Sequence, residues 1–414
     1  MWRILFEEFW GDLVAQKTRA LLTTFAVVWG SMSVVLLLAF GEGLKHEVTT
    51  GLLNAGEKMF MIWGGTTSQP FEGLPRGRRI RLTEEDLTLL KRSIPDVDMV
   101  SPSYGRGTTS LEVEGVRTNT FMEGVYPSFG DMRHMYPKAG GRFLDEKDLT
   151  ERRRSLFLGD SIAARLFPGG HPVGQTVKLD GLPFTVVGVM ETKFQDSQNN
   201  GPDAERAIIP ASTFRSIYGD RYVDHLLVRP RDVNQAAFVK REIFRVLGAR
   251  HRFAAADTHA LGIWDFIEDA KQNRAIGLGI QIFLGLVGAF TLVVAGVGLA
   301  NVMVVAVRER TPEIGVKLAI GARRRHIVAQ FVFEALLLAL AGGLVGLLVA
   351  SLIVVGVDAV PAGNPALVYL LNPRLSWPIA FISVGILVAI GLVAGILPAR
   401  RAATVDPVES LRYE

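Results

Sequence analysis

Two long apolar segments of this chain flank residues 308–334, which read RERTPEIGVKLAIGARRRHIVAQFVFE. The stretch carries six lysine and arginine residues. Thr311 is a suitable N-cap, and Pro312 suits the first helical position, where no N–H group is needed. Gly321 is placed to end the helix, with an arginine run just beyond it. The pattern therefore predicts a short helix of about two to three turns.

The predicted helix has one apolar face and a charged start. Ile314 and Leu318 fall on one face because they are four residues apart. Glu313 in the first turn favours the positive end of the helix dipole. We interpret the stretch as a cytosolic loop that receives force from a separate ATPase. The alternative is an ordinary basic loop that its charge holds on the inner side of a membrane.

Long uncharged runs decide the class of protein. The chain has 414 residues, of which 49% are hydrophobic. Four windows contain no Asp, Glu, Lys, Arg or His, namely residues 20–41, 275–307, 335–357 and 375–399. Each is at least as long as the roughly 20 residues that a membrane-spanning helix needs. The fold class that we predict is a membrane protein of four transmembrane helices with a large extracytoplasmic α/β domain.

Basic residues near the ends of the spans predict the orientation. The N-terminal segment, the central loop and the tail are rich in lysine and arginine, whereas residues 358–374 hold only Arg374. Both termini and the central loop are therefore expected in the cytosol. Residues 42–274 are expected outside, which places the protein in a bacterial inner membrane.

The same runs divide the chain into segments. Residues 1–19 have apolar residues at helical spacing and predict an amphipathic helix at the membrane surface, the alternative being a frayed start of the first span. Apolar spacing continues past the first span and, at Ile263, Phe266 and Ile267, before the second. We infer that spans one and two extend outward together as a stalk. The predicted segments are the interfacial helix at 1–19 and the first span with its stalk at 20–58, followed by the outside domain at 59–258. The stalk and second span at 259–307 lead into the cytosolic loop at 308–334 and the third span at 335–357. The short outside loop at 358–374, the fourth span at 375–399 and the cytosolic tail at 400–414 complete the chain.

The large outside region predicts a mixed α/β domain. Thr83, with Asp86 three residues later, is typical of a capping box. Gly115 and the pair Asp180-Gly181 lie between alternating apolar runs and predict hairpins. The expected strands are 60–63, 96–104, 109–125 as a hairpin, Ser155–Leu158, Thr176–Leu179, 184–189 and 223–228. The order of elements predicts an interrupted subdomain, 59–125 with 223–258, and an inserted subdomain, 126–222. Residues 193–206 are polar and are expected to form a mobile loop.

Small residues four apart let helices approach closely within a bilayer. We therefore expect helix packing at five glycines: Gly285, Gly342, Gly346, Gly391 and Gly395.

The sequence contains no recognisable catalytic constellation. It has no Gly-Lys pair, so the phosphate-binding loop of P-loop ATPases is absent. The seven histidines show no metal-like spacing. The net charge is only +4 and the basic residues lie beside the membrane segments, which indicates membrane topology and contact with anionic lipid, not nucleic acid. The spans hold no ionisable side chain, which argues against an ion pathway. We predict a membrane subunit that is not an enzyme, binds no cofactor and draws energy from another protein.

These motifs together resemble the MacB/FtsX-like permeases of ABC transporters. The most specific matches are RERTPEIGVKLAIGARRRHIVAQFVFEA at 308–335 and LPARRAATVDPVESLRYE at 397–414. The first span, LLTTFAVVWGSMSVVLLLAFGEG at 21–43, is also similar. So are GGRFLDEKDL at 140–149 and LGDSIAARLFPGGHPVGQTVKLDGLPFTVVGVM at 158–190. Residues 191–206 depart most from the family pattern.

The resemblance implies how the chain works. It implies a separate ATPase subunit, because only 19 residues precede the first span, with ATP and Mg²⁺ bound on that partner. It also implies a dimer of permeases, identical or related, and motion of the outside domain without a tunnel through the lipid. A periplasmic adaptor is a further expected partner of such an exporter. Two alternatives stay open: release of lipoproteins, with an apolar collar near 48–53 and 264–267, and activation of a cell-wall hydrolase.

The coupling helix of the family corresponds to residues 311–320. The ATPase-docking residues that we expect are Thr311, Pro312, Glu313, Ile314, Gly315, Lys317, Leu318, Gly321, Ala322 and Arg323.

Overall fold

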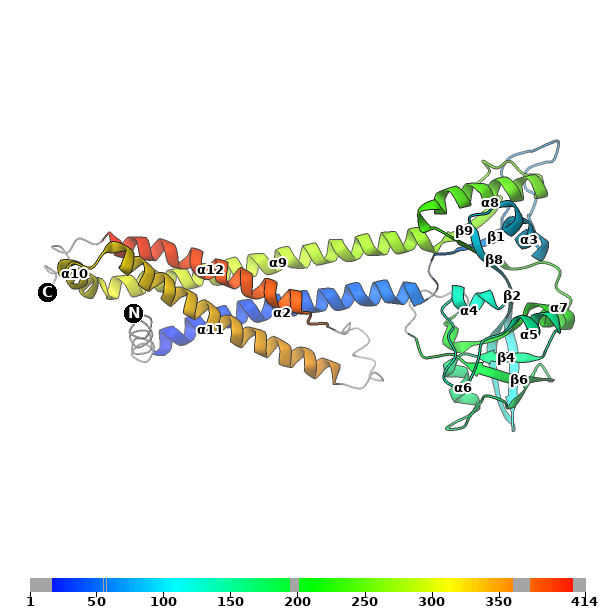
Figure 1. The fold of residues 1–414 in the computed structure, drawn as a ribbon, viewed down its shortest axis with the longest axis horizontal. Helices are drawn as coiled ribbons and strands as arrows, with labels where there is room; N and C mark the ends of the chain where they lie inside the picture. The colour runs from blue at the N-terminus through cyan, green and yellow to red at the C-terminus, as the bar shows by residue number, and fades with distance from the viewer. Residues whose placement is uncertain (1–16, 55, 57, 194–200, 360–372, 405–414) are drawn as a thin grey trace. The chain divides into compact units, whose positions relative to one another are not determined.

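The structure of the protein is a computed structural model, drawn in Figure 1. It describes residues 17–54, 56, 58–193, 201–359 and 373–404. The chain divides into two compact units, one formed by Met1–Glu47 with Ala275–Glu414 and the other by Val48–Arg274. We describe the two units in turn.

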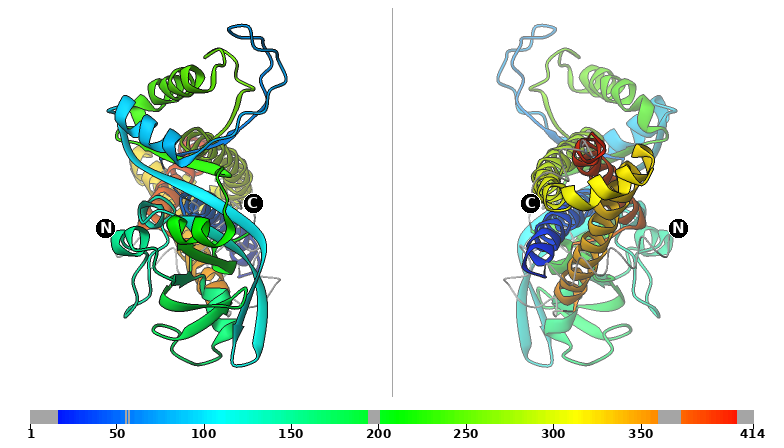
Figure 2. Two further views of the ribbon diagram at one scale, coloured as in Figure 1. Left: turned by 90° about the vertical axis from the view of Figure 1, so that its right-hand side faces the viewer. Right: turned by 90° about the vertical axis from the view of Figure 1, so that its left-hand side faces the viewer.

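The first unit is a bundle of long apolar helices with one short helix at one end. Figure 2 (right) views the bundle from the end at which the short helix α10 lies. The helices are α2 (Lys17–Asn54), α9 (Phe266–Glu309), α10 (Thr311–Ala319), α11 (Arg324–Asp358) and α12 (Trp377–Ala403). Four of them are long and apolar enough to cross a membrane. The prediction of four such helices is thus confirmed.

Helices α2 and α9 contact each other through small side chains. A Cβ atom built on Gly30 would lie 2.9 Å from Cβ of Ala295, and one built on Gly41 would lie 2.8 Å from a methyl of Leu284. Further along, Nε2 of Gln281 donates to Oε2 of Glu42 at 3.0 Å. The two helices therefore pair closely over several turns within this unit.

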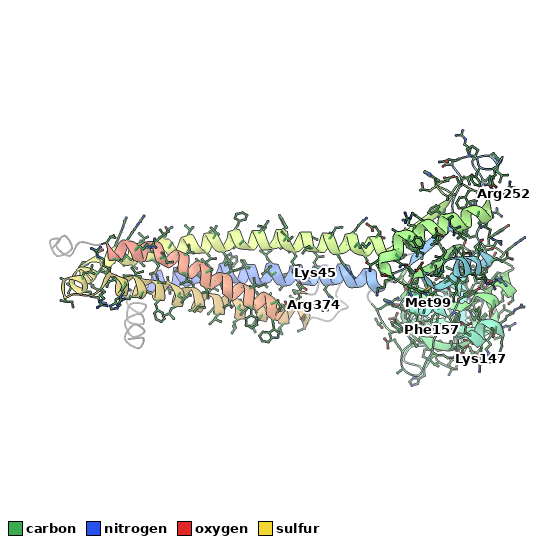
Figure 3. The ribbon with its side chains drawn as sticks, turned by 45° about the horizontal axis from the view of Figure 1, so that its top comes forward. Lys45, Met99, Lys147, Phe157, Arg252 and Arg374 are labelled. Carbon is green, nitrogen blue, oxygen red and sulfur yellow. The ribbon has the colours of Figure 1, made fainter. Side chains whose placement is uncertain are left out.

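Charged side chains mark both ends of the apolar part of the bundle. At one end lie Lys45 and Arg374, labelled in Figure 3, and the N–H of Arg374 donates to the carbonyl of Ala39 at 2.9 Å. The other end carries Arg308. From Gln281, level with the first end, α9 rises about 40 Å to Arg308 at about 1.5 Å per residue. This span fits a hydrocarbon core of about 30 Å plus part of the headgroup layers.

Two hydroxyl groups inside the long helices bond to the backbone of their own helix. Oγ1 of Thr291 donates to the carbonyl of Val287, and Oγ of Ser351 donates to that of Leu347, four residues back in each case. Such bonds satisfy a polar group where no water is available.

The second unit is an α/β domain. Its described strands are β1 (Phe60–Gly64), β2 (Val97–Val113), β3 (Val116–Val125), β4 (Ser155–Leu158), β5 (Thr176–Leu179), β6 (Leu182–Val189), β7 (Arg206–Pro210), β8 (His225–Pro230) and β9 (Leu261–Asp265). Its helices are α3 (Glu84–Ser93), α4 (Ser128–Met132), α5 (Glu146–Thr150), α6 (Asp160–Leu166), α7 (Ala211–Tyr218) and α8 (Ala236–His251), with 3₁₀ turns at Asp203–Glu205 and Val233–Gln235.

One mixed sheet runs through this domain. Its strand order is β3-β7-β4-β6-β5-β2-β8-β1-β9, and β2 also pairs with β3. The pairs β3–β7 and β4–β6 are parallel, and the other pairs are antiparallel. The prediction of a mixed α/β domain is confirmed. The division into two subdomains stays a prediction, because the sheet is continuous.

Local sequence signals explain several of these elements. The predicted capping box forms at the start of α3, where the N–H of Thr83 donates to the Asp86 carboxylate at 2.7 Å. The predicted hairpins form at Glu114-Gly115 and at Asp180-Gly181, where both residues of each pair have positive φ. Two consecutive positive φ angles match the turn whose twist suits paired strands.

The prediction that the second long helix already includes Ile263 is wrong. Ile263 lies in β9, where it pairs with Ile62 of β1, and the helix begins only at Phe266. Phe266 and Ile267 are buried, as helical spacing predicted. Pairing with a strand some 200 residues earlier overrides the local helical pattern, a tertiary effect that periodicity cannot show.

The loop predicted at 193–206 is wrong for its described C-terminal part. Residues 203–205 form a 3₁₀ turn, and Arg206 opens the buried strand β7. Asp203 is buried and bonds to Arg133 at 2.7 Å and to Lys193 at 2.8 Å. Arg206 bonds to the buried carboxylate of Glu123 at 2.6 Å. These five side chains, which we call the buried ion cluster, fix a stretch whose polar sequence is typical of a loop.

Burial and opposite charge act against each other on this cluster. Burial alone would raise the pKa of Asp203, but Arg133, Lys193 and Arg206 hold it well below its usual value. Burial alone would lower the pKa of Arg206, but Glu123 and Asp203 raise it. Asp203 and Arg206 are therefore both charged in the folded protein.

Some predicted segments lie wholly or partly outside the described residues. The interfacial helix at 1–19 is described only from Lys17, which begins α2. The loop 358–374 is described only at its ends, and the tail only to residue 404. Within the tail, α12 continues four residues past the predicted end of the fourth span, to Ala403.

Candidate functional site

The basic stretch between α9 and α11 folds into the predicted short helix. α10 spans Thr311–Ala319, with Pro312 in the first turn and Glu313 at its acidic start. The N-cap is Arg310 and not Thr311, which is a correction. The hydroxyl of Thr311 donates instead to the carbonyl of Val307, at 2.9 Å, in the last turn of α9. Thr311 therefore ties α10 to α9 across a single-residue break.

Gly321 ends the helix as its position predicts. Its φ is +96°, in the left-handed region that glycine tolerates best. Its N–H donates to the carbonyl of Leu318 at 3.0 Å, and that of Ala322 donates to Lys317 at 2.9 Å. This pair of bonds is the Schellman motif. Arg323 is exposed and caps the start of α11.

One face of α10 is part of the bundle core. Ile314 is 3% exposed and belongs to a cluster with Met303, Ile327 and Phe331. Gly315 is buried as well, and Leu318 packs against the same cluster. Ile314 and Leu318 share a face, as their spacing predicted, but that face is turned inward. They position α10 and are not free to meet another protein.

The opposite face of α10 is exposed and mixed in character. Val316 is 47% exposed and Ile320 is 81% exposed. Glu313 lies on the same face, since positions 313, 316 and 320 repeat at helical spacing. Exposed apolar side chains next to charges are typical of a surface that another protein covers. We call Glu313, Val316 and Ile320 the exposed α10 face.

An ion pair braces the loop against the bundle. Nη1 of Arg310, at the break between α9 and α10, lies 3.1 Å from Oε2 of Glu334 on α11. Both side chains are largely buried. The pair links the N-terminal end of α10 to α11.

Four of the five glycines predicted to pack lie against a neighbouring helix. Cβ atoms on Gly342 and Gly346 of α11 would lie 2.8 Å from Val27 and 1.9 Å from Ser31 of α2. Cβ atoms on Gly391 and Gly395 of α12 would lie 2.8 Å from Ala339 and from Ala335 of α11. Gly285 has no described neighbour within 4 Å of such an atom.

Some functional residues have only a weak signal in the sequence and were not predicted. Val316 and Ile320 are ordinary apolar residues, and only the packed structure shows which helical face is outward. Gly343 also packs tightly, with a Cβ position 2.5 Å from Leu387, yet it forms no Gly-x-x-x-Gly pair of its own. Glu334 directly precedes the uncharged run 335–357, and its pairing with Arg310 could be anticipated only from their opposite charges.

Two family models match most of the chain. The model described as the MacB-like periplasmic core domain matches residues 20–245. The model described as the FtsX-like permease C-terminal matches residues 285–407, which include α10.

Curated relatives cover the same length of this chain. "Macrolide export ATP-binding/permease protein MacB" of Bdellovibrio bacteriovorus is 30% identical over 411 residues, which is 97% of this chain and 60% of that protein. "Pyoverdine export ATP-binding/permease protein PvdT" of Pseudomonas putida is 30% identical over 98% of this chain and 59% of that protein. The chain therefore spans about three fifths of the length of these relatives.

A solved structure is similar to part of the chain. The periplasmic region of MacB from Actinobacillus actinomycetemcomitans is 21% identical, with a TM-score of 0.43, and the match covers 53% of this chain and 94% of that one. Since one family model alone covers more than half of the sequence, the chain, with its four apolar helices and its periplasmic α/β domain, belongs to the MacB/FtsX-like permease family of ABC transporters.

Proposed function

We propose that the chain is the permease part of a MacB-like exporter, which an ATPase drives from the cytosolic side. The ATPase docks on the exposed α10 face, and its cycle of ATP binding and hydrolysis moves the periplasmic domain. ATP and Mg²⁺ are bound by the ATPase, and this chain supplies the moving part. The relatives' names specify different cargoes, so we propose export across the cell envelope without assigning a cargo.

The observation that carries the proposal is the two-sided packing of α10. Its inner face, at Ile314 and Leu318, is buried in the bundle, and Arg310 and Glu334 brace its connection. Its outer face is left exposed at Val316 and Ile320. A force applied to the outer face is thus passed directly to α9 and α11. Of the residues predicted to dock, we now assign contact to Glu313 and the flanking Arg323, and positioning to Ile314, Gly315, Leu318 and Gly321.

The charge distribution supports the orientation. The end of the bundle with α10 carries Arg308, Arg323, Arg324 and Arg325, whereas Arg374 is near the other end. Basic residues next to spans favour the cytosolic side. We therefore place α10 and both termini in the cytosol of an inner membrane.

Transmission through α9 is the route that we propose. α9 is one uninterrupted helix from Phe266 to Glu309. At about 1.5 Å per residue its length exceeds the hydrocarbon core about twofold. A helix of this length moves as a lever, which suits mechanical coupling without a polar path through the lipid.

Exposed apolar side chains on the bundle support a second permease as a partner. Phe283, Phe290 and Val294 of α9 are all more than half exposed. In a membrane such a surface meets lipid or another helix. We propose a pair of permeases, identical or related, and a periplasmic adaptor as a further partner.

The docking proposal is tested by charging the exposed α10 face. The tagged full chain is purified in detergent from its own membranes, and co-purifying ATP hydrolysis is measured. We expect Val316→Asp with Ile320→Asp to lose at least about nine tenths of that activity, because two carboxylates replace the apolar contacts.

The matched control is Phe238→Asp, an exposed apolar residue of α8. It should retain the co-purifying activity. Unchanged activity with the α10 variant would show that the ATPase docks elsewhere. Ile314→Asp is not a useful probe, because it buries a charge in the bundle core.

A further inference from the structure

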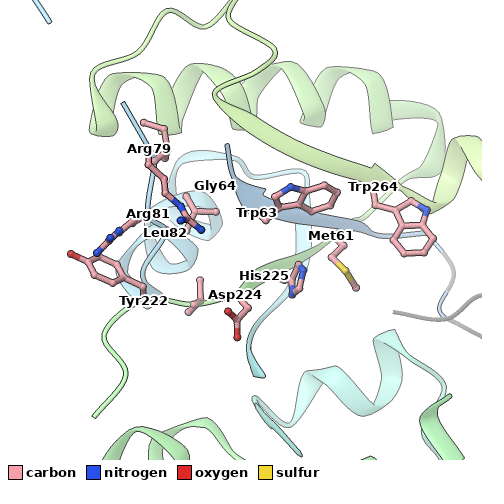
Figure 4. A pocket seen from close by; sticks show the side chains of 12 residues that line it. Met61, Trp63, Gly64, Arg79, Arg81, Leu82, Tyr222, Asp224, His225 and Trp264 are labelled. Carbon is pink, nitrogen blue, oxygen red and sulfur yellow. The ribbon is translucent and has the colours of Figure 1, made fainter. Parts of the chain in front are cut away.

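A cavity of about 540 Å³ lies in the α/β domain, away from the coupling loop. Figure 4 shows its lining side chains. It is formed by β1, the segment 79–82, the segment 222–225 and one residue of β9. Pockets of this size accommodate small organic ligands.

One end of the cavity is aromatic. Trp63 of β1 packs flat on Gly262, where a Cβ atom would lie 2.1 Å from the indole. The ring of His225 meets that of Trp63 edge-on, with centroids 6.0 Å apart. Trp264 adds a second indole, whose Nε1 donates to Asp269 at 2.5 Å. Trp63 nevertheless stays 38% exposed, so its free face is available for stacking.

The other end of the cavity is cationic. In the segment 79–82, Ile80 and Leu82 are buried in the main core, and the alternate residues Arg79 and Arg81 are exposed along the cavity. Within the described chain neither arginine forms an ion pair with an acidic side chain. The guanidinium of Arg81 lies over the ring of Tyr222 at 5.0 Å. Two guanidinium groups are thus left for an external anion.

The walls that carry these groups are fixed by backbone bonds. The N–H of Ile80 donates to Gly65 at 2.9 Å, and that of Val223 donates to Leu82 at 3.0 Å. A Cβ atom on Gly64 would lie 2.0 Å from the carbonyl oxygen of Ile80, so the segment is pressed against β1. A site on rigid segments holds its groups in place before a ligand arrives, which lowers the cost of binding.

The remaining charge in the cavity is small. Asp224 is the one carboxylate among the lining residues, and its Oδ2 already accepts the N–H of Gly105 at 2.6 Å. Burial lowers the pKa of His225, so its imidazole is neutral at pH 7. The lining therefore carries one excess positive charge, with both cations at the end away from the indoles (Figure 4).

We propose that this cavity binds a small amphiphilic anion, in which a planar apolar ring system stacks on Trp63 and a carboxylate or sulfonate meets Arg79 and Arg81. Guanidinium groups match planar carboxylates in geometry and charge. A neutral ring lacks the ionic contact, and a cationic ring is repelled. The inference stands on the α/β domain alone and does not depend on docking at α10.

The test uses 2-naphthoate as the probe and the full chain in nanodiscs of zwitterionic lipid. Binding is measured by saturation-transfer difference NMR, with empty nanodiscs as the reference for partition into lipid. The neutral analogue 2-naphthalenemethanol and the cationic analogue 2-naphthylmethylammonium are measured in parallel. We expect naphthoate to bind at least about tenfold more tightly than either analogue, as one charge-assisted pair implies.

Two variants separate the two ends of the cavity. Arg79→Gln with Arg81→Gln should weaken the binding of naphthoate at least about tenfold and leave the binding of the neutral analogue unchanged. Trp63→Ala should weaken the binding of both probes. The controls Arg76→Gln with Arg92→Gln, and Phe238→Ala, remove exposed side chains of the same kinds that do not line the cavity.

The result can also go against the proposal. Naphthoate binding that the arginine pair does not change, binding no tighter than that of the neutral analogue, or no binding at millimolar probe would each overturn it. The arginine variant alters only exposed side chains, so a folding defect in Trp63→Ala would leave the decisive comparison intact.

Discussion

The bundle and the α/β domain hold their interiors together in opposite ways. In the bundle, Gly346 meets Ser31 and Gly391 meets Ala339, with little more than backbone between the helices. In the α/β domain, Arg206 and Asp203 are fully buried and charged. The lipid-facing unit gains from close approach because burial of apolar surface gives no advantage in lipid. The water-facing domain retains buried charges because each has a partner.

Breaking the buried ion cluster should have the largest effect. Asp203→Asn leaves Arg133, Arg206 and Lys193 with Glu123 as their one carboxylate in the cluster. We expect the free energy of unfolding of the α/β domain to fall by about 3–5 kcal/mol, the usual cost of an uncompensated buried charge. Urea unfolding of the full chain in detergent, followed by tryptophan fluorescence, measures this.

The control for that variant is Asp98→Asn. Asp98 pairs with Arg229 at 2.7 Å, but its side chain is 40% exposed. Exposed pairs contribute about 0–1 kcal/mol. Equal losses in the two variants would mean that burial of the cluster does not matter.

Adding a methyl group at a glycine contact of the bundle should have a smaller effect and lower the stability of the bundle by about 1–3 kcal/mol. Gly346→Ala places a methyl 1.9 Å from Oγ of Ser31 and 2.7 Å from the carbonyl of Val28, so α2 and α11 must separate. Gly285→Ala introduces the same methyl where no described atom lies within 4 Å. We expect a lower midpoint of thermal aggregation in detergent for the first variant and no loss for the second.

If Gly285→Ala were as harmful as Gly346→Ala, the contrast between tight and open glycines would be wrong. Such a result would also indicate that another chain covers Gly285 in the assembly.

Lowering the pH should have the smallest of these effects on the free energy of unfolding of the α/β domain. The folded pKa of Asp203 lies below its unfolded value of about 3.9, so the unfolded chain binds more protons between the two values. Its contribution to stability is present above about pH 4 and is lost as the pH falls toward the folded pKa. Because one proton is involved, the free energy of unfolding changes by at most about 1.4 kcal/mol per pH unit.

The check is a series of urea unfolding curves between about pH 5 and about pH 3, which brackets the unfolded pKa of an aspartate. Asp203→Asn should show a shallower slope than the unmodified chain. Parallel slopes would assign the acid sensitivity to other carboxylates, such as Asp148, whose pKa is also lowered: burial opposes the shift, and bonds from Arg142 and Ser155 outweigh it.

The sequence predicted those parts of the fold that local signals determine. Uncharged runs identified the four long helices, and turn residues such as Asp180-Gly181 fixed the hairpins. Ser155–Leu158 has the predicted bounds. The strands β7 and β9 were missed because their pairing partners are distant in sequence, and their polar or helical patterns point elsewhere.

The candidate site was predicted in position but not in orientation. The helix after Arg310 and its end at Gly321 follow from local chemistry. Which face of α10 is outward depends on what the bundle covers, so Ile314 was assigned to docking although it is buried. The cavity beside Trp63 was not foreseen, because its walls come from four separate segments.

The hydroxyl groups of Thr291 and Ser351 have a consequence for motion. Each is satisfied four residues back on its own helix, so neither needs an adjacent helix as a hydrogen-bond partner. One helix can then slide or rotate against the next without breaking a hydrogen bond at these two positions. Resistance to such sliding then comes from the close steric contacts at the glycines, and not from hydrogen bonds of these two hydroxyl groups.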